Sequence, residues 1–180
     1  DLPLELGLVD ELIAARRNLH GGGRGAPRRL EDGNHEGRAL NRACVVMLTS
    51  TLQAYAGDVF LACSEKAFGR QLTEDERKDY AKTWSRWGNP SDENIIALFR
   101  RLGINDVFNG LSWQGQSTTA LKKKLKTINQ VRNKIAHGQD ILVDGQPYAL
   151  TLNSIQGWRR VMQTFGERFE AHALSKIIRD

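Results

Sequence analysis

The chain has 180 residues, of which 40% are hydrophobic and 26% charged, and its formal net charge is +5. This length suits one domain with its own core, and the composition excludes bulk disorder and a collagen-like fibre. The sequence contains no run of about 18 apolar residues, which argues against a membrane-spanning helix. We therefore expect a single domain over residues 1–180 that does not enter a membrane.

The two cysteines, Cys44 and Cys63, fall in one stretch with a helical pattern. A rise of about 1.5 Å per residue would place them too far apart to bridge each other within that helix. Neither has a second Cys or a His at zinc-ligand spacing, so we expect no metal and no cofactor. A chain without a disulfide framework is typical of a reducing, cytoplasmic setting.

Apolar spacing predicts an N-terminal helix over residues 4–19. Its expected buried stripe is Leu4, Leu8, Leu12 and Ala15. Residues 21–33 are rich in Gly, Arg and Pro, which predicts a mobile loop. The core is expected over residues 36–178, and it begins with a long helix from about residue 36 to residue 67.

Thr73 and Glu76 have the spacing of a capping box, which predicts that a helix begins there and ends before Gly88-Asn89-Pro90. Ser91 is the predicted cap of a short helix that Gly103 closes. Ser117 is the predicted cap of a helix that ends at His137, with Gly138 in the left-handed position after it.

Residues 141–150 contain two short apolar runs around Asp144-Gly145, which predicts a small β-hairpin. Pro147 restricts this hairpin to an edge. A last helix is predicted from about residue 153 to residue 178. Together these elements predict an all-α helical bundle with one small β-hairpin.

Positive charge is concentrated in two segments. Residues 16–29 contain five arginines and no acid, and residues 107–139 contain six basic residues and no acid. The rest of the chain then carries a net charge of −6, because the whole chain carries +5. This segregation favours a polyanionic partner such as RNA, although a solvated lysine face and an arginine loop without function would look the same. The candidate RNA-binding residues are Lys122, Lys123, Lys126, Lys134, Arg24, Arg28 and Arg29.

The helix that ends at His137 carries the residues best suited to chemistry. On a helical wheel Arg132 lies only about 20° from Leu121, inside the apolar stripe. A buried arginine must be paired or must reach an anion. Asn133 and His137 are four residues apart, and an imidazole titrates near neutral pH. Arg132, Asn133 and His137 together offer the groups needed to hold a phosphate and move protons around it.

Alternatives remain open for each residue. Arg132 can be a core arginine paired with Asp58 or Glu65, and His137 can be an ordinary helix-capping histidine. The Arg…His spacing also occurs at Arg28 and Arg29 with His35, so the spacing alone is weakly specific. The helical context favours the match at residues 132–137.

Arg132-Asn133-Lys134-Ile135-Ala136-His137-Gly138 resembles the signature of the HEPN superfamily, namely Arg, a polar residue, variable residues and His near a helix end. The wider chain is similar to the RiboL-PSP-HEPN branch. The residues that carry this similarity are 40–55, with Leu40-Asn41-Arg42-Ala43, and 88–104, with Gly88-Asn89-Pro90-Ser91. The similarity extends over roughly residues 38–170.

The resemblance implies a helical bundle that forms a homodimer and cleaves RNA without a metal, as a toxin or an antiphage-defence nuclease with a possible cognate antitoxin protein. In such a site His137 would act as general acid or base, Arg132 would stabilise charge on phosphorus, and Asn133 would orient the phosphate or His137. The products would be a 2′,3′-cyclic phosphate and a 5′-hydroxyl. The alternative is a non-catalytic module of the same fold that binds RNA, a nucleotide or a protein.

Two departures from the family pattern matter. Gln53 stands where the branch often has an acid, which either frees Arg132 for phosphate or removes an orienting group. Gln139 stands where the adenylylated toxins of the superfamily have a tyrosine, so that class of toxin is not expected.

Overall fold

The computed structural model describes residues 2–19 and 27–178. Within them the helices are α1 (Gly7–Asn18), α2 (Arg38–Phe68), α3 (Glu74–Ser85), α4 (Asp92–Arg100), α5 (Thr118–Ala136) and α6 (Leu152–Ser175). The two strands, β1 (Leu142–Val143) and β2 (Gln146–Pro147), pair antiparallel and form a hairpin. The predicted all-α architecture with one small hairpin is confirmed.

The sequence signals that start and stop these helices act as predicted. Thr73 and Glu76 form a complete capping box at α3, and Ser91 and Ser117 accept a backbone N–H at the starts of α4 and α5. The hairpin turns at Asp144 and Gly145, both with positive φ, as a primed turn requires.

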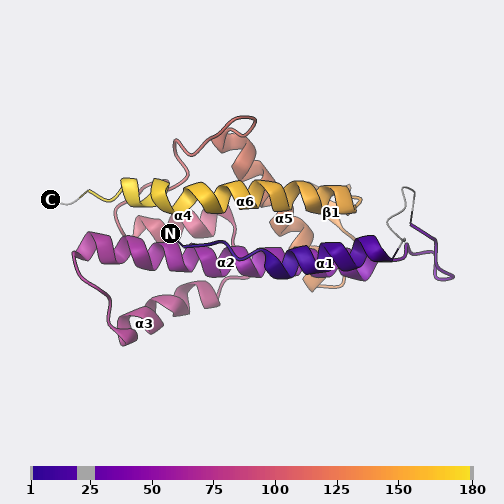
Figure 1. Cartoon of the computed structure of the whole chain (residues 1–180), viewed down its shortest axis with the longest axis horizontal. Helices are drawn as coiled ribbons and strands as arrows, with labels where there is room; N and C mark the ends of the chain where they lie inside the picture. Colours follow the sequence, from indigo (N-terminus) through magenta and orange to yellow (C-terminus); the bar gives the residue numbers. More distant parts are fainter. Residues whose placement is uncertain (1, 20–26, 179–180) are drawn as a thin grey trace.

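α2 is the central helix of the bundle and contacts α1, α3, α4, α5 and α6. In Figure 1, α2 and α6 run side by side, α1 covers the first half of α2, and α3 lies along its second half. Because α2 is surrounded, its sequence is apolar on several faces rather than along one stripe.

By length and composition α2 would also be able to cross a membrane, and among the described residues it is the one helix that would. However, 61% of its most apolar window is buried inside the structure. A central bundle helix has this composition because its neighbours cover it, so the composition of α2 is weak evidence for a membrane span.

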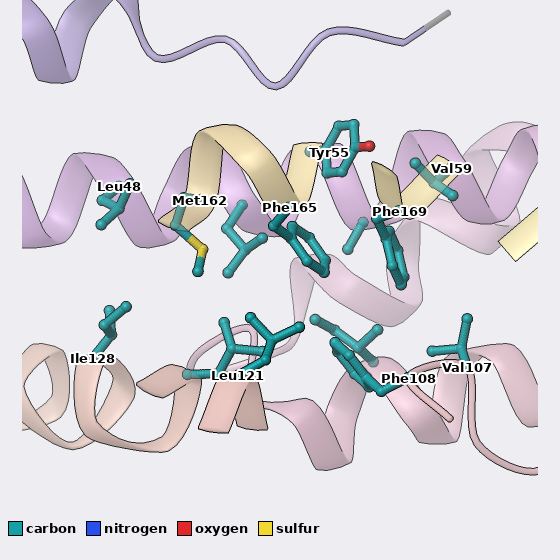
Figure 2. Packing of buried hydrophobic residues seen from close by; sticks show 14 of the residues in the cluster. Leu48, Tyr55, Val59, Val107, Phe108, Leu121, Ile128, Met162, Phe165 and Phe169 are labelled. Carbon is teal, nitrogen blue, oxygen red and sulfur yellow. The ribbon is translucent and has the colours of Figure 1, made fainter. Parts of the chain in front are cut away.

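Aromatic rings fill the core between α2 and α6. Phe165 and Phe169 stack with ring centroids 4.5 Å apart, and Phe108 stacks on both. Figure 2 shows these rings between α2, with Tyr55 and Val59, and the α4–α5 segment that carries Phe108. Tyr55 also donates its hydroxyl to the carbonyl of Gly166 at 2.7 Å, which ties α2 to α6.

The predicted apolar stripe of the N-terminal helix is right for Leu4 and Leu12, which pack against the core, and wrong for its other two residues. Leu8 is 56% exposed and Ala15 is exposed, whereas Val9, Ile13 and Arg16 face the core. Both sets of residues have helical spacing, so the period alone could not choose between them. Packing against α2 determines which face of α1 is buried. On that face the Arg16 Nε donates to the Asn41 Oδ1 of α2 at 3.1 Å.

Gly37 makes room for the buried Arg16 side chain. A Cβ at residue 37 would lie 2.4 Å from the Arg16 Nε, and the φ of +80° at this position also disfavours other residues. The guanidinium of Arg16 therefore lies against the backbone at the start of α2.

Candidate functional site at the end of α5

The end of α5 is a well-formed helix terminus. Gly138 has φ +63° and donates its N–H to the Ile135 carbonyl at 3.1 Å, while the Gln139 N–H reaches the Lys134 carbonyl at 2.9 Å. These two bonds define a Schellman motif with His137 as the C-cap residue. The predicted role of Gly138 is confirmed, and the last turn of α5 is a fixed platform for Arg132, Asn133 and His137.

Arg132 lies on the apolar stripe of α5, as predicted, but near the C-terminal end of the stripe, where the side chains are partly exposed. Leu121, Leu125, Ile128 and Val131 are buried, whereas Arg132 is only half-buried. Its Nη1 lies 3.4 Å from the Asn133 Oδ1. No carboxylate of the described residues lies within ion-pair distance of it, so its charge is available to an anion.

The two carboxylates considered as partners of Arg132 are engaged elsewhere. Glu65 pairs with Arg77. Burial raises the pKa of Asp58, and the positive charge that counters this effect comes from Arg77. The interpretation of Arg132 as a core arginine paired with either acid is therefore wrong.

Gln53, which stands where the family often has an acid, contacts α3 instead of Arg132. Its Nε2 donates to the carbonyl of Trp84 at 2.7 Å, near the end of α3. The neighbouring Gly57 lets the Trp84 ring pack against α2, since a Cβ at Gly57 would lie 2.4 Å from the ring. Gln53 thus positions α3 and the loop that follows it.

Asn133 is held by a residue that the sequence analysis did not single out. The Asn89 Nδ2, in the loop between α3 and α4, donates to the Asn133 Oδ1 at 3.2 Å. The Asn89 carbonyl accepts from the Asn94 Nδ2 at 2.9 Å, and the Asn129 Nδ2 donates to the Pro90 carbonyl at 3.2 Å. The segment Gly88-Asn89-Pro90 is therefore fixed against α5, and its place in the family-like stretch was the signal that could have identified it.

His137 is exposed, and its side chain makes no hydrogen bond or ion pair with the described residues. Its backbone N–H donates to the Asn133 carbonyl at 3.1 Å. His137 follows Arg132 by five positions and Asn133 by four, which on an ideal helix corresponds to about 140° and about 40°. The structure brings Arg132 and Asn133 into contact, whereas His137 is the C-cap residue and its side chain is exposed.

The lysines of the acid-free segment differ in how they are paired. Lys122 forms an ion pair with Asp106 at 2.6 Å and lies over the ring of Phe108, and Lys126 lies 3.4 Å from Asp144. Lys134 donates to the Gln139 Oε1 at 3.0 Å. Lys123 is exposed and has no ion pair with a described residue. Of the four, Lys122 is the least available to RNA.

The arginine-rich segment is described by the structure from residue 27 onward. Arg24 lies outside the described residues. Arg28 and Arg29 are exposed, but Arg29 and His35 form a β-bridge, and the Glu36 N–H donates to the Arg28 carbonyl at 2.9 Å. These bonds close a turn ahead of α2, residues 27–33 contain no helix and only the isolated bridge at Arg29, and the mobility of this loop stays a prediction.

A shallow depression of about 300 Å³ lies beside the site, between α5 and the hairpin. Its lining residues are Gln130, Asn133, Lys134, Leu142, Asp144 and Gly145. Asn133 thus faces both Arg132 and this depression. No group of three or more His, Cys, Asp and Glu side chains able to hold a metal ion occurs within residues 2–19 and 27–178.

The comparison with protein families agrees with this geometry. The RiboL-PSP-HEPN family model matches residues 66–174, which is more than half of the chain and includes α3 to α6 with the whole end of α5. The match leaves out residues 40–55, for which the sequence also suggested a resemblance. No curated protein and no solved structure matches the chain. The chain belongs to the RiboL-PSP-HEPN family.

Proposed function

We infer from membership in a HEPN family that this chain has a function related to RNA. We propose that this chain is an endoribonuclease that needs no metal and cleaves RNA through attack of the ribose 2′-hydroxyl. The observation that carries the proposal is the half-buried Arg132. It contacts Asn133, has no carboxylate partner among the described residues, and lies on the same helix end as the exposed His137.

In the proposed reaction the 2′-oxygen attacks phosphorus and the bond from phosphorus to the 5′-oxygen breaks. Neutral His137 takes the proton of the 2′-hydroxyl, or protonated His137 gives a proton to the leaving 5′-oxygen. The guanidinium of Arg132 stabilises the charge that develops on the phosphoryl oxygens. Asn133, held by Asn89, orients the phosphate. The products are a 2′,3′-cyclic phosphate and a 5′-hydroxyl.

We propose that the active form is a homodimer in which two α5 ends face one cleft. The support is that Arg132 forms no ion pair with a described residue and that the exposed imidazole of His137 makes no hydrogen bond with one, so a single chain leaves both groups without a partner of that kind. A second copy would supply a His137 to the side on which the first copy presents Arg132. The two histidines would then share the two proton transfers.

The second candidate is a non-catalytic module that binds RNA. The exposure of His137 favours it, because no described side chain orients the imidazole as a general base requires. This candidate predicts RNA binding that weakens steeply with salt, without cleavage.

The test is incubation of mixed RNA with the protein in EDTA, followed by analysis of the product ends. His137→Ala should lower cleavage by a factor of about 10²–10⁴, as expected for loss of an acid–base group. His35→Ala is the matched control, since it removes the histidine of the competing Arg28–Arg29–His35 spacing and should cleave like the wild type. Cleavage that survives in His137→Ala would contradict the assignment.

The proposed cellular role, a toxin or an antiphage nuclease with a possible cognate antitoxin, has its own test. Induced expression of the wild type should arrest bacterial growth, and expression of His137→Ala should not. Equal toxicity of the two forms would rule out a role that depends on cleavage.

A further inference from the structure

The β-hairpin is not needed by the proposed reaction, yet it is fixed firmly to α5. The Gln130 Nε2 donates to the Asp144 Oδ1 at 3.0 Å, and the Gln130 Oε1 accepts the Asp144 N–H at 2.9 Å. Lys126 adds a third contact to the same Oδ1, at 3.4 Å. The depression between the hairpin and α5 is therefore held open by paired polar groups.

Leu142 forms an apolar wall of this depression without a core function. Its neighbours Ile141 and Val143 pack against the hydrophobic core, whereas Leu142 does not belong to the core or to the residues packed on it. Alternation along the strand explains the difference, because successive side chains point to opposite faces. Leu142 is half-buried and lines the depression instead.

The polar groups of the depression suit a neutral, planar ligand with hydrogen-bonding edges. Asn133 contributes an amide and Lys134 a cation, whereas both amide atoms of Gln130 already bond Asp144. Both side-chain contacts of Asp144 go to Oδ1, so Oδ2 has no partner among the described residues and remains an acceptor. The amino group of a base can donate to this oxygen.

Size and position agree with this chemistry. A volume of about 300 Å³ lies at the lower end of the roughly 300–1,000 Å³ found for small-molecule pockets. Proteins that recognise single-stranded RNA commonly place an unstacked base against a side chain and bond its edge. Asn133 lies at the border between the depression and Arg132.

We propose that this depression is a nucleobase subsite that takes an amino-bearing base, adenine or cytosine, next to the phosphate at Arg132 and Asn133. The base would lie against Leu142 and donate its amino group to the Asp144 Oδ2. This inference rests on the proposed function for the position of the phosphate, but the recognition of the base can be tested without cleavage.

The first test is titration of the ¹⁵N-labelled protein with AMP, CMP, UMP and ribose 5-phosphate, followed through the amide signals of Leu142 and Gly145. AMP or CMP should shift these signals at lower concentration than UMP, and ribose 5-phosphate should not shift them. Equal shifts with ribose 5-phosphate would mean that the depression binds phosphate only, and absence of shifts with every nucleotide would also overturn the subsite.

Two variants and a control sharpen this titration. Leu142→Asp should abolish the shifts, and Asp144→Asn should weaken binding of AMP and CMP about tenfold, as expected when a hydrogen bond loses its charged partner. Gln146→Ala, on the exposed strand of the hairpin, should bind like the wild type. Unchanged binding by Leu142→Asp, with the hairpin signals still dispersed, would contradict the proposal.

The second test separates this inference from the proposed function. If the wild type cleaves RNA, sequencing of the cut ends should show a preferred adenine or cytosine beside the cut, and Asp144→Asn should lose this preference. Cleavage with the same preference in wild type and variant would overturn the subsite and leave the nuclease standing. If the wild type does not cleave, the nuclease proposal fails and the titration alone decides the subsite.

Discussion

The first turns of α5 and its last turn lie in the same acid-free segment, residues 107–139. Basic side chains of the first turns form ion pairs with acids, whereas Arg132 in the last part of the helix does not form one with a described residue. Lys122 and Lys126 meet Asp106 and Asp144, two acids that lie just outside that segment. Arg132, further along the same helix, forms no ion pair with a described residue, and its Nη1 lies 3.4 Å from the Asn133 Oδ1. The comparison teaches that a charge-rich stretch does not have uniformly available charge, because the fold supplies counterions to one part of it.

The largest effect is expected from the last turn. Arg132→Ala should reduce cleavage by about 10²–10³-fold, the loss typical of one donor to a developing negative charge. Arg132→Lys should recover only part of the activity, since lysine keeps the charge without the planar fork. The measurement is kcat/KM on a single-stranded RNA in EDTA.

The exposed Arg160 on α6 provides a matched control for this experiment. Arg160→Ala should cleave like the wild type. If Arg160→Ala and Arg132→Ala lose activity equally, the effect is one of general charge and the contrast between the two parts of α5 is lost.

A smaller effect is expected from the loop that fixes Asn133. Asn89→Ala removes the donor to the Asn133 Oδ1 and should lower kcat about five- to tenfold, which corresponds to a hydrogen bond of about 1 kcal/mol. KM should change less than kcat if Asn89 acts by positioning. Asn153→Ala, on the exposed start of α6, is the control, and a loss of the same size there would argue against a specific role of Asn89.

The lysines should affect binding rather than cleavage chemistry. Lys123→Gln should lower the salt dependence of binding to single-stranded RNA, by about 0.7 in the log–log slope for the one phosphate that this unpaired lysine neutralises. Lys122→Gln should leave the slope unchanged, because Asp106 already neutralises Lys122. Dissociation constants in a His137→Ala background, over a series of salt concentrations, would check this, and an equal change of slope for Lys122→Gln would contradict it.

The smallest effect concerns stability in acid. Burial by itself raises the pKa of Asp106, but the hydrogen bond from Lys122, the N–H of Phe108 and nearby positive charge hold it below its usual value. The pair therefore stabilises the fold above the unfolded pKa of the acid, and this stabilisation disappears as pH falls through the lowered pKa.

Lys122→Met should remove this acid-dependent part of the stability, by less than about 1 kcal/mol because 34% of the Asp106 side chain is exposed. Thermal unfolding from about pH 2 to pH 6 would measure it, with the more exposed pair of Lys126 and Asp144 as control through Lys126→Met. A lower melting temperature of Lys122→Met at pH 6 that is equally low, relative to wild type, at pH 2 would show that Lys122 acts through packing on Phe108 rather than through its charge.

Local signals in the sequence predicted the helix ends well. Thr73, Ser91, Ser117 and Gly138 cap helices through contacts within one turn, so three or four residues contain the necessary information. The stripe of α1 could not be predicted in the same way. Both faces of α1 show the same helical spacing of apolar residues. From the sequence alone Arg16 would be assigned to the surface, and only its contacts with Asn41 and Gly37 in the fold explain why it is buried.

The candidate site likewise has one part that the sequence predicts and one part that only the fold shows. The spacing of Arg132, Asn133 and His137 on one helix, and the glycine that ends it, follow from the sequence. The contact with Asn89 and the pairing of Lys122 with Asp106 join residues 44 and 16 positions apart, which no local pattern reveals.

By itself, the sequence determined that this protein is a helical bundle of HEPN type with its candidate chemistry at the end of one helix, because periodicity, caps and a short motif act locally. Only the tertiary structure decided which basic residues keep an available charge, which face of α1 is buried, and that the hairpin holds a depression open beside Asn133. These properties depend on which distant side chains become neighbours, and the packing around α2 sets those neighbours.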